Sequence, residues 1–517
     1  MTGPALWAAA RLRVALWDRT LASPERLRRA QQETLLAHCR TAAATEFGRA
    51  HGLSSVRSDA DFRRAVPLRT YADFEPQLER MRAGQRDVLW PGLIPYYGQS
   101  SGTSATAAKN KFLPISLEQI RWQQKAGFDV MARYLALSGD TAVTGGYFLA
   151  LFPPGRIKRE GAVGVASNPG LMQLHMPLLT RPMMLPLPAV RDIEDYDRKL
   201  DTIAASYLEH DVRLVSGTTC WFSILFDRVL AAARAAGRRA STISEVWPNL
   251  RVLMGGGVPA EPYRKIIEER MGKSVALMDN YNATEGGIFA ATSSFSDDSL
   301  TVLPDRGVYF EFVPRGREDE PGAPRLPLWE VETDVDYAVA LTTSSGLFGY
   351  LIGDYVRFSS VFPHRLRFAG RKSGVLSLTQ ELMTQLEIER AVAAASSSTG
   401  ATVVDFAAGP DVGVGGTAKG RYSFFVEFER EPGDPAAFMA SLDSSLREQN
   451  RVYREHRHSD VAILFPELVA LPRGATRKFM AAVGQTSVQN KFPHIVDERK
   501  GGLLRSLAGA TTTRGEQ

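Results

Sequence analysis

The sequence has few cysteines, no long apolar run and little net charge for its 517 residues. Its two cysteines, Cys39 and Cys220, exclude a disulfide scaffold and a cysteine-built zinc site. They fit a reducing compartment, so we expect a cytoplasmic protein. No stretch reaches the roughly 18 consecutive apolar residues that a membrane span needs. The formal net charge of +5 is too dilute to indicate a nucleic-acid partner, although it suits an anionic small substrate.

The residues that are present predict a globular protein of two or three domains, since 44% are hydrophobic and 23% are charged. Near the N-terminus the patterns predict helices over 5–20, 24–47 and 70–84. Ser23 is expected to cap the second helix, Pro24 to occupy its first position and Gly48 to end it.

The middle of the chain alternates strand-length apolar runs with helical patterns, which predicts a largely parallel sheet covered by helices. The expected strands are 142–151, 212–215, 251–254 and 275–278, with helices at 220–236 and 260–271. Between about 300 and 370 the pattern becomes almost purely β. A smaller α+β unit follows, and the Gly-, Ser- and Thr-rich end from Arg499 is expected to be mobile. We therefore predict an α/β fold with a large N-terminal domain, 1–370, and a smaller, mobile α+β C-terminal domain, 371–517.

A loop of small residues is the first segment suited to chemistry. It consists of Ser100, Ser101, Gly102, Thr103 and Ser104. Backbone N–H groups and hydroxyls in such a loop bind phosphate, and a lysine nearby adds positive charge. A solvated Ser/Thr loop is the alternative.

The same letters allow a rival interpretation, because residues 98–102 match the G-x-S-x-G nucleophile elbow of serine hydrolases. That motif needs a helix directly after the serine. Residues 111–115 instead have an extended pattern, which argues against a hydrolase.

Three further segments each follow a predicted strand. Gly255, Gly256 and Gly257 permit close approach of a ligand. In the second segment, Tyr281 is suited to stack on a base and Glu285 to bind Mg²⁺, which prefers oxygen ligands. Asp354 follows an apolar strand and is suited to hold ribose hydroxyls. Each of these signals is weak alone.

In their order and spacing these segments resemble the core motifs of the adenylate-forming enzymes. Within that group the chain is similar to the acyl acid amido synthetases of the auxin-responsive Gretchen Hagen three family and its bacterial members. The resemblance extends over nearly the whole chain, through residues 45–48, 61–63, 66–68, 87–92, 247–250, 281–286, 307–312, 350–354, 368–371 and 453–454.

The resemblance implies an ATP site made by the residues named above. Ser100 to Ser104 would form the phosphate loop, Gly255 to Gly257 and Tyr281 would frame the adenine, and Asp354 would hold the ribose. Asn282 and Thr284 lie in the same ATP-binding segment, Glu285 would bind Mg²⁺, and Arg371 marks the hinge of the C-terminal domain. Cys220 and Trp221 would lie beside the acyl group.

The catalytic lysine of the family lies in a C-terminal segment that Gln489-Asn490-Lys491-Phe492-Pro493 resembles, so Lys491 is our candidate and Lys478 the second possibility. Its ammonium would offset charge on the α-phosphate. The run from Ala105 to Ala108 departs from the family pattern, which leaves open whether Lys109 or Lys111 faces the phosphates.

One further pattern, His456-x-x-x-Asp460, fits an acyltransferase signature, but arginines surround it and we interpret it as a polar helix end. The implied reaction has two steps: ATP-Mg²⁺ and a small carboxylic acid give an acyl adenylate and pyrophosphate, and an amine or amino acid then forms the amide and releases AMP. The alternatives are a thioester ligase that uses coenzyme A or a carrier protein, and a non-catalytic nucleotide-binding relative. The sequence leaves the acid, the amine, the oligomeric state and the biological pathway open.

Overall fold

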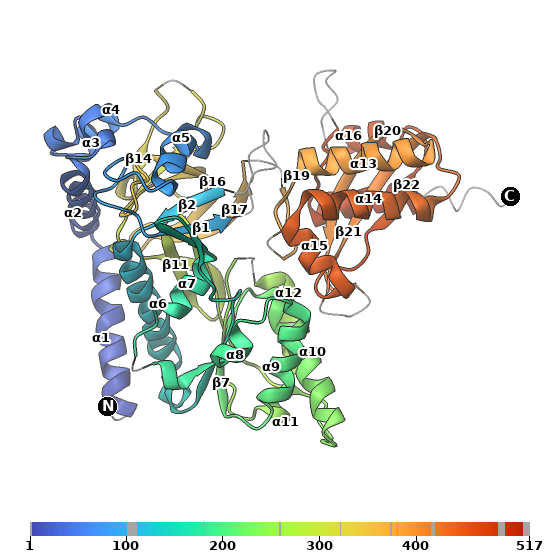
Figure 1. Ribbon diagram of the computed structural model, residues 1–517, viewed down its shortest axis with the longest axis horizontal. Coiled ribbons are helices and arrows are strands. Elements are labelled where there is room, and N and C mark those ends of the chain that lie inside the picture. Colours follow the sequence, from blue (N-terminus) through green and yellow to red (C-terminus); the bar gives the residue numbers. More distant parts are fainter. Residues whose placement is uncertain are drawn as a thin grey trace.

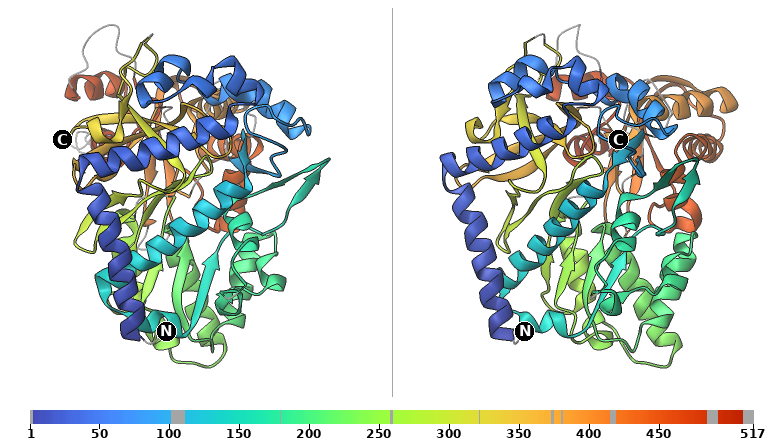
Figure 2. Two further views of the ribbon diagram at one scale, coloured as in Figure 1. Left: turned by 90° about the vertical axis from the view of Figure 1, so that its left-hand side faces the viewer. Right: turned by 60° about the vertical axis from the view of Figure 1, so that its left-hand side comes forward.

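The structure, a computed structural model, describes residues 3–100, 111–178, 180–257, 260–320, 322–372, 375–379, 381–414, 419–483 and 492–509. Its N-terminal helices lie on one side of the molecule and its C-terminal elements on the other, as Figures 1 and 2 show. Sheets from the middle of the chain lie between them.

Five helices open the chain: α1 (Gly3–Leu21), α2 (Pro24–Ala42), α3 (Glu46–Ala50), α4 (Asp59–Ala65) and α5 (Tyr71–Arg82). The Ser23 side chain caps α2 by accepting from the backbone N–H of Arg26, as predicted. The prediction that this helix runs to residue 47 and ends at Gly48 is wrong, because Thr45 caps a new helix by accepting from the Gly48 N–H. Gly48 therefore lies inside α3 and not at the end of α2.

A small mixed sheet follows, in the order β2-β1-β5-β4. Its strands are β1 (Tyr96–Ser100), β2 (Lys111–Ile115), β4 (Lys158–Glu160) and β5 (Val163–Ala166), with helices α6 (Leu117–Ser138) and α7 (Asn168–Leu174) beside them. Trp17 of α1 donates to the Val302 carbonyl at 2.7 Å, and Arg13 pairs with Asp129 of α6 at 2.8 Å. These contacts hold α1 against the body of the protein.

The predicted parallel sheet is present, with five strands in the order β6-β3-β7-β8-β9. They are β3 (Tyr147–Leu151), β6 (Met184–Leu185), β7 (Val212–Gly217), β8 (Val252–Met254) and β9 (Ala276–Met278). Its helices are α8 (Pro188–Arg191), α9 (Tyr196–Ser206), α10 (Cys220–Ala235), α11 (Ile243–Val246) and α12 (Glu261–Met271). The expected strand at 142–151 is shorter than predicted, because 141–145 form a 3-10 helix.

An eight-stranded sheet follows in the order β10-β11-β12-β17-β16-β15-β13-β14, with every described pairing antiparallel. Its strands are β10 (Asn280–Ala283), β11 (Gly287–Ser294), β12 (Asp297–Val302), β13 (Val308–Pro314), β14 (Leu326–Pro327), β15 (Asp336–Thr343), β16 (Tyr350–Ser360) and β17 (Arg365–Arg371). This agrees with the β pattern predicted between about 300 and 370.

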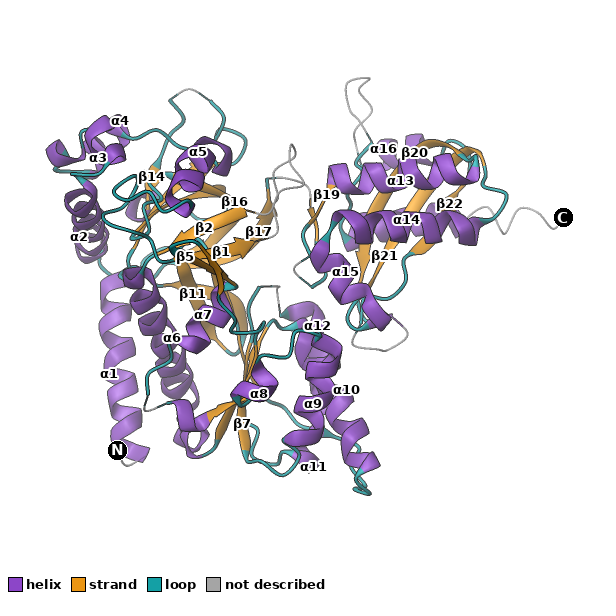
Figure 3. Cartoon of the chain, viewed as in Figure 1, coloured by secondary structure: helices purple, strands orange, loops and turns teal. Residues whose placement is uncertain are grey.

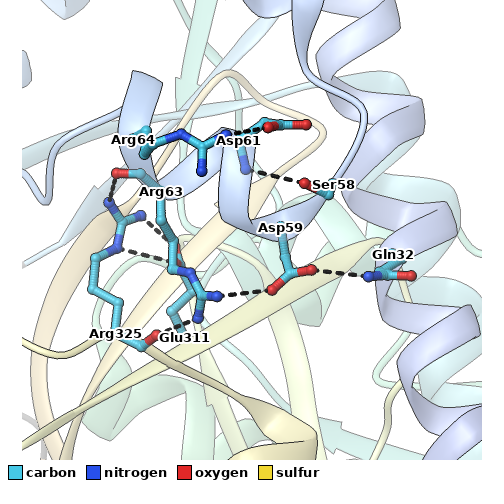
Figure 4. Close-up of polar contacts among 8 residues, drawn as sticks. All are labelled: Gln32, Ser58, Asp59, Asp61, Arg63, Arg64, Glu311 and Arg325. Carbon is cyan, nitrogen blue, oxygen red and sulfur yellow. Dashed lines mark hydrogen bonds and ion pairs between the residues drawn. The ribbon is translucent and has the colours of Figure 1, made fainter.

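A polar network joins the N-terminal helices to this sheet (Figure 4). Arg325 donates to both oxygens of Glu311 on β13, at 2.9 and 2.6 Å. Arg63 of α4 donates to the Arg325 carbonyl at 2.6 Å and to Asp59 at 3.0 Å. The Glu311 side chain is 0% exposed and that of Arg325 is 8% exposed, so this is a buried bidentate ion pair.

The Glu311→Gln variant is expected to lower the free energy of unfolding by about 3–5 kcal/mol, because it leaves the buried Arg325 guanidinium without its counter-charge. Chemical denaturation followed by circular dichroism measures the change. Arg64→Ala is the matched control, since Arg64 pairs with Asp61 on the same helix, α4, and its side chain is 74% exposed. That variant is expected to change stability by less than about 1 kcal/mol. Equal effects of the two variants would contradict the prediction.

The C-terminal unit, residues 375–509, is built on the three-stranded sheet β20-β21-β22. Its elements are β18 (Val375–Leu376), β19 (Met383–Thr384), α13 (Gln385–Thr399), β20 (Thr402–Asp411), β21 (Arg421–Arg430), α14 (Pro435–Gln449), α15 (Arg451–Arg457), β22 (Glu467–Leu471), α16 (Ala475–Ala482) and α17 (Glu498–Gly509). Helices α13 and α14 cover one face of the sheet (Figure 3). Its own apolar clusters and its smaller α+β make-up agree with the predicted fold class.

The expectation of a mobile end from Arg499 is wrong up to Gly509, because α17 packs on this sheet. Gly501 and Leu504 are buried in a cluster with Phe425, and Arg505 pairs with Glu467 at 2.6 Å. Residues 510–517 lie outside the described ranges. Among the described helices, none is both long and apolar enough to cross a membrane.

Candidate nucleotide and acyl site

Three predicted segments meet at one edge of the parallel sheet, because the carboxyl ends of parallel strands lie together. Strand β7 leads to Thr219 and α10, β8 leads to the three glycines, and β9 leads to Asn280. A Cβ on Gly255 would lie 2.2 Å from Oγ1 of Thr219, and one on Gly256 would lie 2.8 Å from the Asn282 amide nitrogen. Close packing therefore requires glycine at 255 and 256. Gly257 has a φ of +80°, a backbone conformation that favours glycine.

The start of the predicted phosphate loop lies beside the segment that contains Thr284. A Cβ on Gly98 of β1 would lie 2.4 Å from the Thr284 methyl group, and Gln119 of α6 donates to the Thr284 carbonyl at 2.9 Å. Ser100 ends β1, and its side chain is not described. Ser101, Gly102, Thr103, Ser104 and Lys109 lie outside the described residues.

The described chain resumes at Lys111 as β2, which pairs antiparallel with β1 so that Lys111 lies opposite Ser100. A nucleophile elbow instead passes from its strand through a tight turn into a helix. This geometry agrees with the sequence argument against a hydrolase.

Asp354 is the centre of a polar cluster. It is 4% exposed, and its two oxygens are both engaged. The Tyr281 hydroxyl donates to one at 3.0 Å, and Nε of Arg371 lies 3.0 Å from the other. Asp354 on β16 and Arg371 on β17 are direct cross-strand partners. Three strands separate β10 from β16 in the sheet order, so the sheet curls to bring Tyr281 to Asp354.

Glu285 adds a second carboxylate to the cluster. The Tyr350 hydroxyl donates to it at 3.5 Å, a long contact. Burial raises the pKa of the Glu285 carboxyl above its ordinary value, and the positive charge of Lys111 opposes that rise. Burial likewise raises the pKa of Asp354, against the charge of Arg371. Two cations and two acids thus share one poorly solvated region, an arrangement that is common at functional sites.

Of the two lysines that the sequence analysis left open, Lys111 lies within the described residues, on β2 opposite Ser100 and close enough to interact with Glu285 and Asp354. Burial lowers the pKa of its ammonium, and the charge of Glu285 raises it. Its Nζ also lies 5.4 Å from the centre of the Tyr71 ring. Sequence reasoning assigned no role to Tyr350 or Gln119, although Tyr350 stands at the start of the 350–354 motif.

A possible Mg²⁺ site rests on Glu285. In the part of the chain that the structure describes, no group of three or more His, Cys, Asp or Glu side chains is arranged to hold a metal. Mg²⁺ in phosphate-transfer sites needs only one or two carboxylates together with phosphate oxygens and water. The chemistry of Glu285 therefore fits a Mg²⁺ that arrives with a nucleotide.

Trp221 is the second residue of α10 and lies at the same edge of the parallel sheet. It is 4% exposed, and its ring centroid lies 4.4 Å from that of Tyr196 and 5.0 Å from that of His456. The helix begins at Cys220, as predicted, and the Cys220 side chain is not described. Lys478 is exposed on α16 of the C-terminal unit, and Lys491 lies outside the described residues.

Three family models match the chain in order along its length. The GH3 family N-terminal domain matches residues 20–222, the central domain 301–371 and the C-terminal domain 386–500. Together with the fold, these matches define an adenylate-forming type of α/β protein. The chain belongs to the GH3 family of acyl acid amido synthetases and is a ligase of that family.

Its relatives are enzymes that join acids to amino acids. The jasmonoyl–L-amino acid synthetase JAR4 of Nicotiana attenuata is 24% identical, with 92% of each chain covered. The probable indole-3-acetic acid-amido synthetase GH3.1 of Arabidopsis thaliana is 25% identical over 90% of this chain and 89% of its own. The solved AtGH3.15 acyl acid amido synthetase in complex with 2,4-DB shares the fold, with a TM-score of 0.59, 18% identity, and coverage of 96% of this chain and 95% of the other.

Proposed function

We propose that the protein uses ATP to adenylate a small carboxylic acid and then transfers the acyl group to an amine or amino acid. The observation that carries the proposal is a cluster of charged and aromatic side chains beside β1, the strand that leads to the predicted phosphate loop. The cluster consists of Lys111, Tyr281, Glu285, Asp354 and Arg371. Its cations are suited to bind phosphate, and its two carboxylates are suited to bind a metal ion and the ribose hydroxyls. The Tyr281 ring lies beside them. Family membership supplies the reaction class.

The nucleotide is proposed to lie across the edge of the parallel sheet. Its phosphates would meet the loop of Ser100 to Ser104, with Lys111 or Lys109 adding charge. Gly255 to Gly257 and Tyr281 frame the adenine, in the segment that also contains Asn282 and Thr284. Asp354 binds the ribose hydroxyls, and Arg371 moves with the domain hinge.

In the first step a substrate carboxylate oxygen attacks the α-phosphate, and the bond to pyrophosphate breaks. Lys491 is proposed to stabilise the negative charge that develops on the α-phosphate. Glu285 would hold Mg²⁺, which neutralises phosphate charge. In the second step the amine nitrogen attacks the acyl carbon, a C–N bond forms, the C–O bond to AMP breaks and one proton leaves the nitrogen.

The proposal includes three finer parts. The protein is a bacterial-type member of the family, it works in the cytoplasm as its cysteine usage predicts, and its two domains meet at 370/371. Support for the last of these comes from the end of β17 at Arg371, one residue beyond the proposed boundary, and from the separate apolar clusters of residues 375–509.

Acid-dependent exchange of labelled pyrophosphate into ATP tests the first step. We expect exchange with at least one acid from a pooled set of aryl and alkyl carboxylic acids, and none without acid. Tight ATP binding with no exchange across a broad pool would contradict the proposal and favour a non-catalytic nucleotide-binding protein.

The Asp354→Asn variant is expected to raise the KM for ATP by about 10- to 100-fold, because a charged hydrogen bond contributes about 1.5–3 kcal/mol. Steady-state exchange at varied ATP measures this. Tyr281→Phe removes only a neutral donor to Asp354 and is expected to have the smaller effect on KM. The reverse order would remove Asp354 from the ribose site.

A further inference from the structure

His456 stands at the point where the C-terminal unit contacts the parallel-sheet part of the protein. Its ring meets the Trp221 ring nearly edge to face, at 81° and 5.0 Å. A few residues further on, Val461 and Ala462 are about 1% exposed and belong to the apolar core around α9 and α10. The acyltransferase-like pattern that drew attention to His456 is not assembled, because Asp460 pairs with Arg457.

A chain of hydrogen bonds fixes the tautomer of this histidine. The fully buried Glu381 carboxylate accepts from the Leu378 and Thr379 N–H groups at 2.7 and 2.8 Å, and from the Thr379 hydroxyl at 2.9 Å. Since the single hydroxyl proton of Thr379 points to Glu381, its oxygen accepts from Nδ1 of His456 at 2.7 Å. Burial raises the pKa of Glu381, and the hydrogen bonds from Leu378 and Thr379 oppose that rise. With Glu381 ionised, the proton is on Nδ1 of His456 and Nε2 carries a lone pair.

Nε2 of His456 has no hydrogen-bond partner among the residues that the structure describes. Burial lowers the pKa of the imidazole to about 3, and the nearby Arg451 charge adds to this, so the ring is neutral at physiological pH. An orienting carboxylate, a hydroxyl and an imidazole with one bare nitrogen form the kind of relay that activates nucleophiles in many enzymes. Here no nucleophilic side chain is bonded to that nitrogen, which suggests that the nucleophile is a substrate.

We propose that Nε2 of His456 accepts a hydrogen bond from the attacking amine and directs its nitrogen at the acyl adenylate. This inference rests on the proposed function, which gives Trp221 a place beside the acyl group. As the C–N bond forms and AMP leaves, the surplus proton on the nitrogen goes to solvent, because an imidazole with so low a pKa orients the amine without keeping its proton. His456 then acts in the second half-reaction only, while Thr379 and Glu381 are positioning residues that hold its ring.

The two half-reactions separate this proposal from the proposed function. Pyrophosphate exchange measures adenylation, and mixing preformed enzyme–acyl adenylate with amine in a single turnover measures transfer. For His456→Ala we expect exchange within about twofold of the unmodified protein and transfer slower by about 10²-fold, because misplacing a reacting atom by about 1 Å can cost this much. Added imidazole is expected to restore part of the transfer rate. Thr379→Val is expected to slow transfer by about tenfold without affecting exchange.

His458→Ala is the matched control, since His458 is exposed two residues away and lies outside the relay. It is expected to leave both rates unchanged. Normal transfer by His456→Ala overturns the inference and leaves the proposed function intact. Equal loss of exchange and transfer, in His456→Ala and Thr379→Val alike, also overturns it, because the contact would then be structural. Failure of the unmodified protein to form an adenylate would instead contradict the proposed function.

Discussion

The Glu285→Gln variant is expected to lose acid-dependent pyrophosphate exchange by about 10²-fold or more, as the loss of a charge-stabilising group commonly does. The amide keeps the shape of the side chain and the contact with Tyr350, but it removes the negative charge that faces Lys111. A weaker Mg²⁺ site follows, because a neutral oxygen binds a hard cation less well than a carboxylate does. Raising the Mg²⁺ concentration is therefore expected to recover part of the rate.

Glu194→Gln is the control for this substitution, since Glu194 is 75% exposed in a surface ion pair with Arg156. Its exchange rate is expected to match that of the unmodified protein. A folded Glu285→Gln variant with near-normal exchange and unchanged Mg²⁺ dependence would remove Glu285 from the metal site.

Substitution of Lys491 by alanine is expected to reduce adenylation by about 10²-fold or more, because the charge that develops on the α-phosphate would lose its ammonium partner. The effect is expected in kcat more than in the KM for ATP, since the interaction strengthens in the transition state. Exchange at saturating acid and ATP measures it.

Lys478→Ala provides the contrast, because Lys478 is the second candidate from sequence and is exposed on α16. It is expected to keep normal exchange. If Lys478→Ala is inactive and Lys491→Ala is active, the assignment of the two lysines must be exchanged.

The fold could be predicted well where one physical signal dominates. Buried parallel strands are continuous apolar runs, so β7, β8 and β9 were located within a few residues of their observed bounds. The errors arose where short-range chemistry competes with composition. Thr45 caps a new helix inside a longer helical pattern, and the glycines within α17, Gly501 and Gly502, concealed an apolar side that contains Leu504.

The site was predictable in its parts but not in its connections. Tyr281 follows β9 as expected, but the expectation that Asp354 follows a strand is wrong, because Asp354 lies inside β16. The structure joins Asp354 to Tyr281 by one hydrogen bond and to Arg371 by an ion pair. The contact between Trp221 and His456 had no sequence signal, because it depends on how two units far apart in the chain pack together. The pattern that first singled out His456 pointed to the wrong partner, Asp460.

The most direct test of the account is mass spectrometry of the protein incubated with Mg-ATP, pooled carboxylic acids, mixed amino acids and amines, and coenzyme A as a competing acceptor. The account predicts AMP together with a new acyl amide whose mass names both substrates. AMP with an acyl thioester and no amide would contradict an amide synthetase and make the protein a thioester ligase.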